Sequence, residues 1–281
     1  MKLVVTSFHS VKGGVGRTTL ALNSAIQAAT NNPDQPVYLI DVDVCGTSLV
    51  DEKELCAPKW NKKVSMETLY SVAPSGFWTA AESKARIDNR NKKDLSVTFV
   101  NDWFLFQTPN WDNETDVLLS ALCWKLEGAP SNLKVIPHSP LPTDVNDIQV
   151  LLNDENHGAF MEGRLEYLLS AICQEHPDKT PIVVFDCPQG LYGLGRSVVS
   201  LGLRLTKSPK DSLAEDGGMP FALEDADVSW TINFVKGSDS QDVRCLERWL
   251  VVAGADRNRI QVISNERLHD CTCNEKSSSR G

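Results

Sequence analysis

The segment Lys12-Gly13-Gly14-Val15-Gly16-Arg17-Thr18-Thr19 decides the fold that we expect for this chain. An apolar, β-branched run at 2–8 leads into it, and a helical pattern at 18–30, with one stripe of small and apolar residues, follows it. Glycines let a backbone turn its N–H groups inward, and the N-terminus of a helix attracts negative charge. A strand, a glycine loop and a helix in this order therefore predict a phosphate-binding loop.

The side chains of this segment add to the prediction. Arg17 supplies a cation for the phosphates, and the hydroxyl of Thr18 is the type of group that binds the Mg²⁺ of a nucleotide. We therefore expect a nucleotide and Mg²⁺ as ligands. The residues that we expect to bind the nucleotide from this segment are Gly13, Gly14, Val15, Gly16, Arg17, Thr18 and Thr19.

Strand and helix patterns alternate along much of the chain. Apolar runs predict strands at 37–40, 133–136, 181–185, 228–235 and 260–263, and helical periodicity predicts helices at 162–174 and 240–252. This alternation predicts an α/β fold with a mostly parallel central sheet and helices on both faces. Ligands bind such sheets at the carboxyl ends of the strands, where the sequence places Asp41, Asp43 and Asp186.

Length and composition fit a single domain. The chain has 281 residues, enough to bury a core without disulfides or a structural metal. Its formal net charge of −9 argues against strong, sequence-blind binding to DNA, although a local basic patch formed on dimerisation stays open. No apolar run approaches the roughly 20 residues of a membrane-spanning helix, so we expect a cytoplasmic protein that does not bind membranes.

The stretch at about 51–130 interrupts the alternation and carries five of the seven tryptophans. We predict an insertion there, and two interpretations of its tryptophans stay open. They are either core and cover residues of a helical insertion or part of a partner-binding surface, because aromatic residues are enriched in interface hot spots.

Three further features carry weaker predictions. A polar tail from about 270 is expected to be disordered. Cys271 and Cys273 within it are either half of a metal or Fe–S site or two free thiols, and their spacing favours free thiols. His138 and His157 match no ligand pattern, so we expect both at the surface.

The glycine segment resembles the deviant Walker A motif of ParA/MinD-like P-loop ATPases, which belong to the SIMIBI class. It departs from the common Walker A pattern because Val11 stands where the first glycine would fall and Arg17 stands at the lysine position. Four more segments resemble motifs of that family, in the family's order: Leu39-Ile40-Asp41-Val42-Asp43-Val44-Cys45-Gly46, Leu133-Lys134-Val135-Ile136-Pro137-His138-Ser139, Val183-Val184-Phe185-Asp186-Cys187-Pro188-Gln189-Gly190 and Ile263-Ser264-Asn265.

The resemblance implies a role for each matching residue. Lys12 would reach across a dimer to the phosphates held by the partner, and Asp43 would orient the attacking water. Arg17 would stand in for the phosphate-binding lysine of the same chain. The remaining implied roles are Mg²⁺ binding for Thr18, Asp41 and Asp186, an α-phosphate contact for Thr19, and an adenine contact for Asn265.

The resemblance also implies a function. We expect an ATP- and Mg²⁺-dependent dimerisation switch with weak ATPase activity, which acts on a partner protein or cargo. Hydrolysis is expected to be slow because the planar guanidinium of Arg17 differs in shape and flexibility from a lysine ammonium. The alternative is a nucleotide-binding regulatory or scaffold subunit with little or no hydrolysis, and a third hypothesis is a metal-carrier relative.

Overall fold

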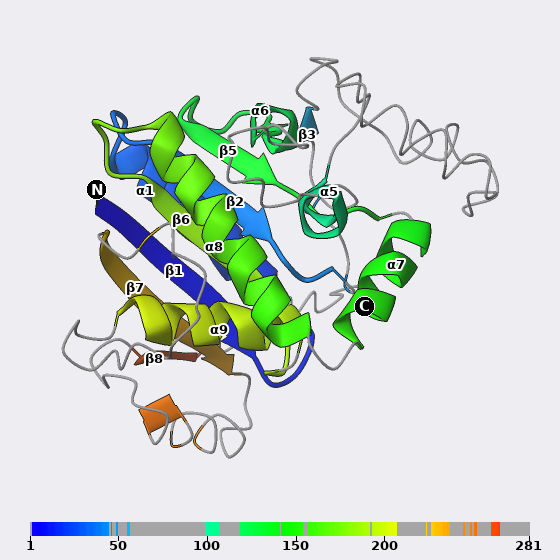
Figure 1. Cartoon of the computed structure of the whole chain (residues 1–281). Coiled ribbons are helices and arrows are strands. Elements are labelled where there is room, and N and C mark those ends of the chain that lie inside the picture. Colours follow the sequence, from blue (N-terminus) through cyan, green and yellow to red (C-terminus); the bar gives the residue numbers. More distant parts are fainter. Residues whose placement is uncertain are drawn as a thin grey trace, which may run out of the picture.

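Figure 1 shows a computed structural model of the chain, which describes residues 2–44, 46, 49, 55–56, 99–106, 119–140, 142–153, 157–191, 193–206, 223, 226–236, 244, 248, 250–251 and 260–264. Several predictions concern residues outside these ranges. They are the adenine contact Asn265, the pair Cys271 and Cys273, the polar tail, much of the segment 51–130 and most of the helix expected at 240–252.

A parallel sheet of six strands lies at the centre of the described fold (Figure 1). Its order is β5-β2-β6-β1-β7-β8, and every neighbouring pair is parallel. The strands are β1 (Lys2–Ser10), β2 (Val37–Asp41), β5 (Leu133–Ile136), β6 (Ile182–Gln189), β7 (Asp227–Lys236) and β8 (Ile260–Ser264). The predicted parallel sheet and its predicted strands are therefore confirmed.

Helices cover both faces of this sheet, as the alternation predicts. The described helices are α1 (Arg17–Asn31), α5 (Val100–Phe106), α6 (Leu119–Leu122), α7 (Pro142–Leu152), α8 (His157–Glu175) and α9 (Gly193–Leu205). In β2 the side chains alternate between two cores: Val37 and Leu39 pack with the alanines of α1, whereas Tyr38 and Ile40 pack with α8 and α9. Figure 1 shows α8 and α9 crossing the sheet on the side toward the viewer.

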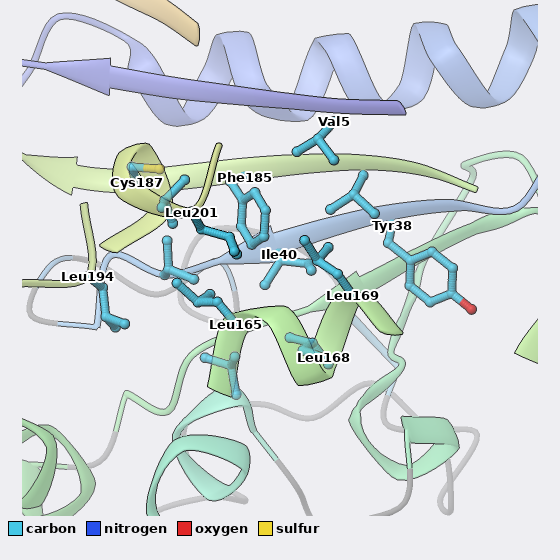
Figure 2. Close-up of a cluster of buried hydrophobic side chains, with 14 of the residues drawn as sticks. Val5, Tyr38, Ile40, Leu165, Leu168, Leu169, Phe185, Cys187, Leu194 and Leu201 are labelled. Carbon is cyan, nitrogen blue, oxygen red and sulfur yellow. The ribbon is translucent and has the colours of Figure 1, made fainter. Parts of the chain in front are cut away.

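The core between the sheet and α8 shows why this helix forms where it does. Leu165, Leu168, Leu169 and Ile172 follow each other at helical spacing, and all four are fully buried. Figure 2 shows Leu165 and Leu169 of α8, with Leu201 of α9, beside the strand residues Ile40 and Phe185. Burial of one apolar stripe therefore fixes α8 against the sheet.

Two of the tryptophans expected in an insertion belong to the core. Trp103 and Trp124 have no exposed surface, and the indole of Trp103 donates a hydrogen bond to the carbonyl oxygen of Arg164 at 2.9 Å. The core interpretation is correct for these two residues. Trp60, Trp78 and Trp111 lie outside the described residues.

A small two-stranded antiparallel sheet, β3 (Leu55–Cys56) with β4 (Lys125–Leu126), accompanies the main sheet. Just before β4, Trp124 forms an antiparallel bridge to Val135 of β5, which is an edge strand of the main sheet. The two residues exchange backbone hydrogen bonds of 2.7 and 2.9 Å. Among the helices that the structure describes, none has the length and apolar character needed to cross a membrane.

Gly202 provides a test of how α9 packs on the sheet. A Cβ at this position would lie 2.9 Å from ring atoms of Trp230 in β7, so Gly202→Ala should destabilise the fold by about 1–3 kcal/mol. Gly163, an exposed glycine of α8, has nothing within 4 Å of its Cβ position. Gly163→Ala should therefore stabilise by about 0.5–1 kcal/mol. Chemical denaturation of both variants measures this, and equal stability of the two would contradict the close packing.

Candidate nucleotide-binding site

The predicted site residues meet because β1, β2 and β6 are neighbours in the sheet. Asp41 at the end of β2 lies beside Asp186 of β6, and Ser10 at the end of β1 lies beside Gln189. The loop after β1 leads directly into α1. A cavity of about 560 Å³ opens at this edge, lined by Ser10, Gly13, Gly14, Val15, Gly16, Arg17, Thr18, Thr19, Asp43, Val44, Gly46, Leu152, Pro188, Gln189, Gly193 and Leu194.

The glycine loop has the backbone conformation that its sequence predicts. Gly14 and Gly16 have φ angles of 71° and 80°, in the left-handed region that favours glycine. Gly16 caps α1 without a side-chain hydrogen bond, and the first turn of the helix contains no acidic residue. The N-terminal end of α1 therefore presents its positive dipole to the cavity with no carboxylate of its own first turn against it.

Arg17 lies at the base of the cavity with its guanidinium engaged by three side chains. Its Nε donates a hydrogen bond to Asp186 Oδ1 at 3.1 Å, and one terminal nitrogen donates to Ser10 Oγ at 3.0 Å. The other terminal nitrogen forms an ion pair with Asp43 Oδ2. Arg17 is 8% exposed. Burial lowers its pKa, but the charges of Asp186 and Asp43 outweigh burial and raise the pKa above its usual value, so the guanidinium stays charged.

Asp41 is buried and holds the turn that follows β2. Its Oδ1 accepts a hydrogen bond from the backbone N–H of Asp43 at 3.1 Å, and its Oδ2 accepts one from the N–H of Leu49 at 3.2 Å. His138 Nδ1 lies 2.9 Å from the same Oδ2. These contacts orient the turn so that Asp43 faces Arg17.

His138 is not at the surface, and that prediction is wrong. It is fully buried at the end of β5, next to Asp41. Burial lowers its pKa, but the Asp41 carboxylate outweighs burial and raises it. Because β5 pairs with β2, the residue that follows β5 comes close to the residue that ends β2. The side chain of His157 lies outside the described residues.

Burial raises the pKa values of both carboxylates that contact Arg17. For Asp186, the Asp41 carboxylate adds to the effect of burial, and Arg17 together with a hydrogen bond from Thr18 counteracts it. For Asp43, Arg17 counteracts burial and Asp41 adds to it. The crowding of three carboxylates at one sheet edge is thus offset by the guanidinium of Arg17.

The carboxylates expected to bind Mg²⁺, Asp41 and Asp186, are engaged by other groups of the chain in this arrangement. Magnesium requires oxygen ligands in near-octahedral geometry. Both oxygens of Asp41 accept hydrogen bonds, and Asp43 and Asp186 each hold Arg17. Within the described residues, no group of three or more His, Cys, Asp or Glu side chains is placed to hold a metal.

Lys12 is exposed on the loop and does not line the cavity, whereas Thr19 is exposed in the first turn of α1 and lines it. Two glycines nearby have roles that the motifs alone did not assign. A Cβ on Gly13 would lie 2.8 Å from Gln189 Oε1, and a Cβ on Gly46 would lie 2.5 Å from the Asp43 carboxylate. The position of Gly46 therefore excludes larger residues because Arg17 holds the Asp43 carboxylate, whereas at Gly13 the side chain of Gln189 would have to shift. Ser10, whose hydroxyl accepts a hydrogen bond from the guanidinium of Arg17, was not among the predicted site residues. Its position immediately before the loop was the only sequence signal for this role.

A buried histidine lies beneath the site. His9 Nε2 is 2.9 Å from Ser7 Oγ and 3.7 Å from Cys187 Sγ, and the ring packs against Phe234. Burial, together with the charge of Arg17, lowers the pKa of His9 to about 3. The imidazole is therefore neutral, which avoids a second buried cation next to Arg17.

Solved structures match the chain over most of its length. A plasmid partition protein from Borrelia burgdorferi is 13% identical, covers 94% of this chain and 78% of its own, and has a TM-score of 0.44. Cobyrinic acid a,c-diamide synthase from Mycobacterium smegmatis, with a bound ATP analog and magnesium, is 15% identical (97% and 77% covered, TM-score 0.46).

A ParA family ATPase from Chlorobium tepidum is also 15% identical (92% and 72% covered, TM-score 0.41). ParA family ATPases are the proteins that the glycine-loop motif resembles. No protein-family model and no curated protein matches the sequence. Because these likenesses are distant, we infer function only from the residues of this chain.

His9 makes the stability of the fold depend on pH. Its pKa is about 3 in the folded chain and about 6.5 when unfolded, so only the unfolded chain binds this proton between those values. The contribution of the neutral His9 to the free energy of unfolding is therefore present near pH 7, and it is lost as the pH falls below 6.5. Between pH 7 and pH 5 the loss should be about 2 kcal/mol.

Urea denaturation of the wild type and His9→Gln at both pH values measures this contribution. The variant should lose about 2 kcal/mol less than the wild type over the same interval, because all other titrating groups are common to both. An equal loss in the two proteins would show that His9 takes up a proton in the folded state.

Proposed function

We propose that the chain binds ATP in the cavity at the glycine loop and acts as an ATP-dependent dimerisation switch with weak ATPase activity, directed at a partner protein or cargo. The observation that carries the proposal is the joint placement of the loop, the α1 N-terminus and the Asp43 turn around one cavity. Its volume of about 560 Å³ lies within the range of small-molecule sites, about 300–1,000 Å³.

The lining of the cavity supports a polyphosphate as the ligand. Backbone N–H groups of a glycine-rich turn and of a helix N-terminus together form a concave anion site. Lys12 adds a cation at the mouth of the loop. The roles of Gly13, Gly14, Val15, Gly16, Thr18 and Thr19 in binding phosphates, and of Asn265 in binding adenine, belong to this proposal.

The proposed dimer rests on the motif that Lys12 belongs to, and the net charge makes it depend on a bridging ligand. Two chains that each carry a formal charge of −9 repel one another, so association needs a bridge that compensates the repulsion. The resemblance to ParA/MinD-like ATPases implies that the Lys12 of one chain would contact the nucleotide of the other. A nucleotide and a cation held together between the two chains would supply this bridge.

Slow hydrolysis is supported by the ion pair between Asp43 and Arg17. A carboxylate that orients an attacking water must be within hydrogen-bond reach of that water. Here one oxygen of Asp43 holds the guanidinium. To orient a water, Asp43 must therefore either release Arg17 or contact Arg17 and the water at the same time. The same ion pair favours the second candidate function, a nucleotide-binding regulatory or scaffold subunit with little or no hydrolysis.

Gly14 provides a test of the binding site with a matched control. Gly14 and Gly128 both have positive φ angles, 71° and 75°, and neither has an atom within 4 Å of its Cβ position. Alanine should therefore strain both sites by roughly 1 kcal/mol. Only Gly14 lines the cavity, so Gly14→Ala should weaken ATP binding by about tenfold or more, and Gly128→Ala should leave it unchanged. Calorimetric titration with ATP decides, and equal affinities of the two variants would argue against this site.

Lys12 provides the test of the switch. The wild type should be a monomer without nucleotide and a dimer with a slowly hydrolysed ATP analogue. Lys12→Ala should remain a monomer although it still binds the analogue, since its own loop amides and helix dipole remain. Light scattering coupled to size exclusion measures the mass. A wild type that stays monomeric at saturating analogue would favour the scaffold function.

A further inference from the structure

The guanidinium of Arg17 connects the ends of three neighbouring strands. It donates hydrogen bonds to Asp186 of β6 and Ser10 of β1, and it pairs with Asp43 in the turn after β2. The side chains of Arg17 and Asp186 are 9% and 2% exposed, so this contact is largely shielded from water. The positive charge thus lies between Asp186, one of the carboxylates expected to bind Mg²⁺, and Asp43, the carboxylate expected to orient water.

Carboxylates next to a polyphosphate repel it unless a cation stands between them. Arg17 already faces Asp43 and Asp186 in this chain, and Asp41 has a separate partner in His138. The N-terminus of α1 adds a partial positive charge of roughly half a unit. Groups of the chain itself therefore offset part of the negative charge of the carboxylates.

We propose that Arg17 is the built-in cation of this site, and that the site binds the nucleotide polyphosphate as the metal-free anion rather than as its Mg²⁺ complex. This inference rests on the proposed binding of ATP and goes beyond it by naming the form of the ligand. Mg²⁺ bound to Asp186 would have to displace the guanidinium from that carboxylate, and Arg17 would then remain buried beside a second cation. The competition with Arg17 weakens any gain in affinity from the metal.

The shape of arginine explains why it serves here. Different nitrogens of its planar group reach Asp186, Ser10 and Asp43 at the same time. A lysine has a single ammonium nitrogen on a flexible stem, so all its contacts start from one atom and it cannot reach three separate partners with separate nitrogens. Lysine at this position would hold one carboxylate less firmly and would leave it open to a metal ion.

Calorimetric titration with ATP, once with excess EDTA and once with excess Mg²⁺ at equal ionic strength, tests the inference on the wild type. The two dissociation constants should agree within about threefold. Arg17→Lys should gain metal dependence and bind ATP about tenfold or more tightly with Mg²⁺ than with EDTA. Ser10→Ala removes one guanidinium contact, leaves both carboxylates in place and should show a smaller gain.

The outcomes separate this inference from the proposed function. A wild type that binds ATP about tenfold more tightly with Mg²⁺ overturns the built-in cation and leaves ATP binding intact. A wild type that binds ATP under neither condition overturns both proposals. If Arg17→Lys does not fold, the wild type and Ser10→Ala still decide, because equal and strong Mg²⁺ dependence in both contradicts a role for Arg17.

Discussion

A buried guanidinium between two carboxylates is the interaction on which the site depends. The strands β1, β2 and β6 end side by side because of the sheet order, and this places Ser10, the Asp43 turn and Asp186 around one point. Without a cation there, two carboxylates with pKa values already raised by burial would repel one another. Removing one partner of such a buried pair costs about 3–5 kcal/mol, so Arg17 holds the loop, the turn and β6 in one arrangement.

The surroundings of Arg17 are adapted to this charge. His9 lies beneath it, and burial keeps that imidazole neutral with a lowered pKa. Gly46 has no side chain where the Asp43 carboxylate lies, and Gly13 has none where Gln189 lies. Asp41 is turned away from Arg17 by two backbone N–H groups and His138. Each neighbour therefore limits the positions that the guanidinium and its carboxylates can take.

Periodicity and motif order were sufficient to predict the sheet and most of its strands. The continuous apolar runs at 37–40 and 133–136 correspond to β2 and β5 within one residue, because strands buried on both faces leave an unbroken apolar signal. The helix α9 was missed. Its glycines and serines dilute the apolar pattern, and the close approach of Gly202 to Trp230 is visible only in three dimensions.

The sequence predicted where the residues of the candidate site lie in the fold, but not which side chains they contact. Motif spacing brought Asp41, Asp43, Asp186 and the glycine loop to one sheet edge, as the structure has them. It could not tell that Arg17 would face carboxylates, because a sequence pattern gives no side-chain direction. His138 was assigned to the surface for the same reason: only the pairing of β5 with β2 places it against Asp41. The roles of all the predicted site residues, from Lys12 and the glycine loop to the three aspartates and Asn265, remain predictions.

The bridge between Trp124 and Val135 has a consequence for how two chains can meet. An edge strand with unpaired backbone groups invites another chain to extend the sheet. At β5, Trp124 already occupies N–H and C=O groups of Val135, and its indole is buried beside them. Strand-to-strand association is thereby blocked at this side of the fold. At this edge a second copy would meet the segment around Trp124 rather than a free strand, so the edge open to sheet extension in the described fold is the one formed by β8.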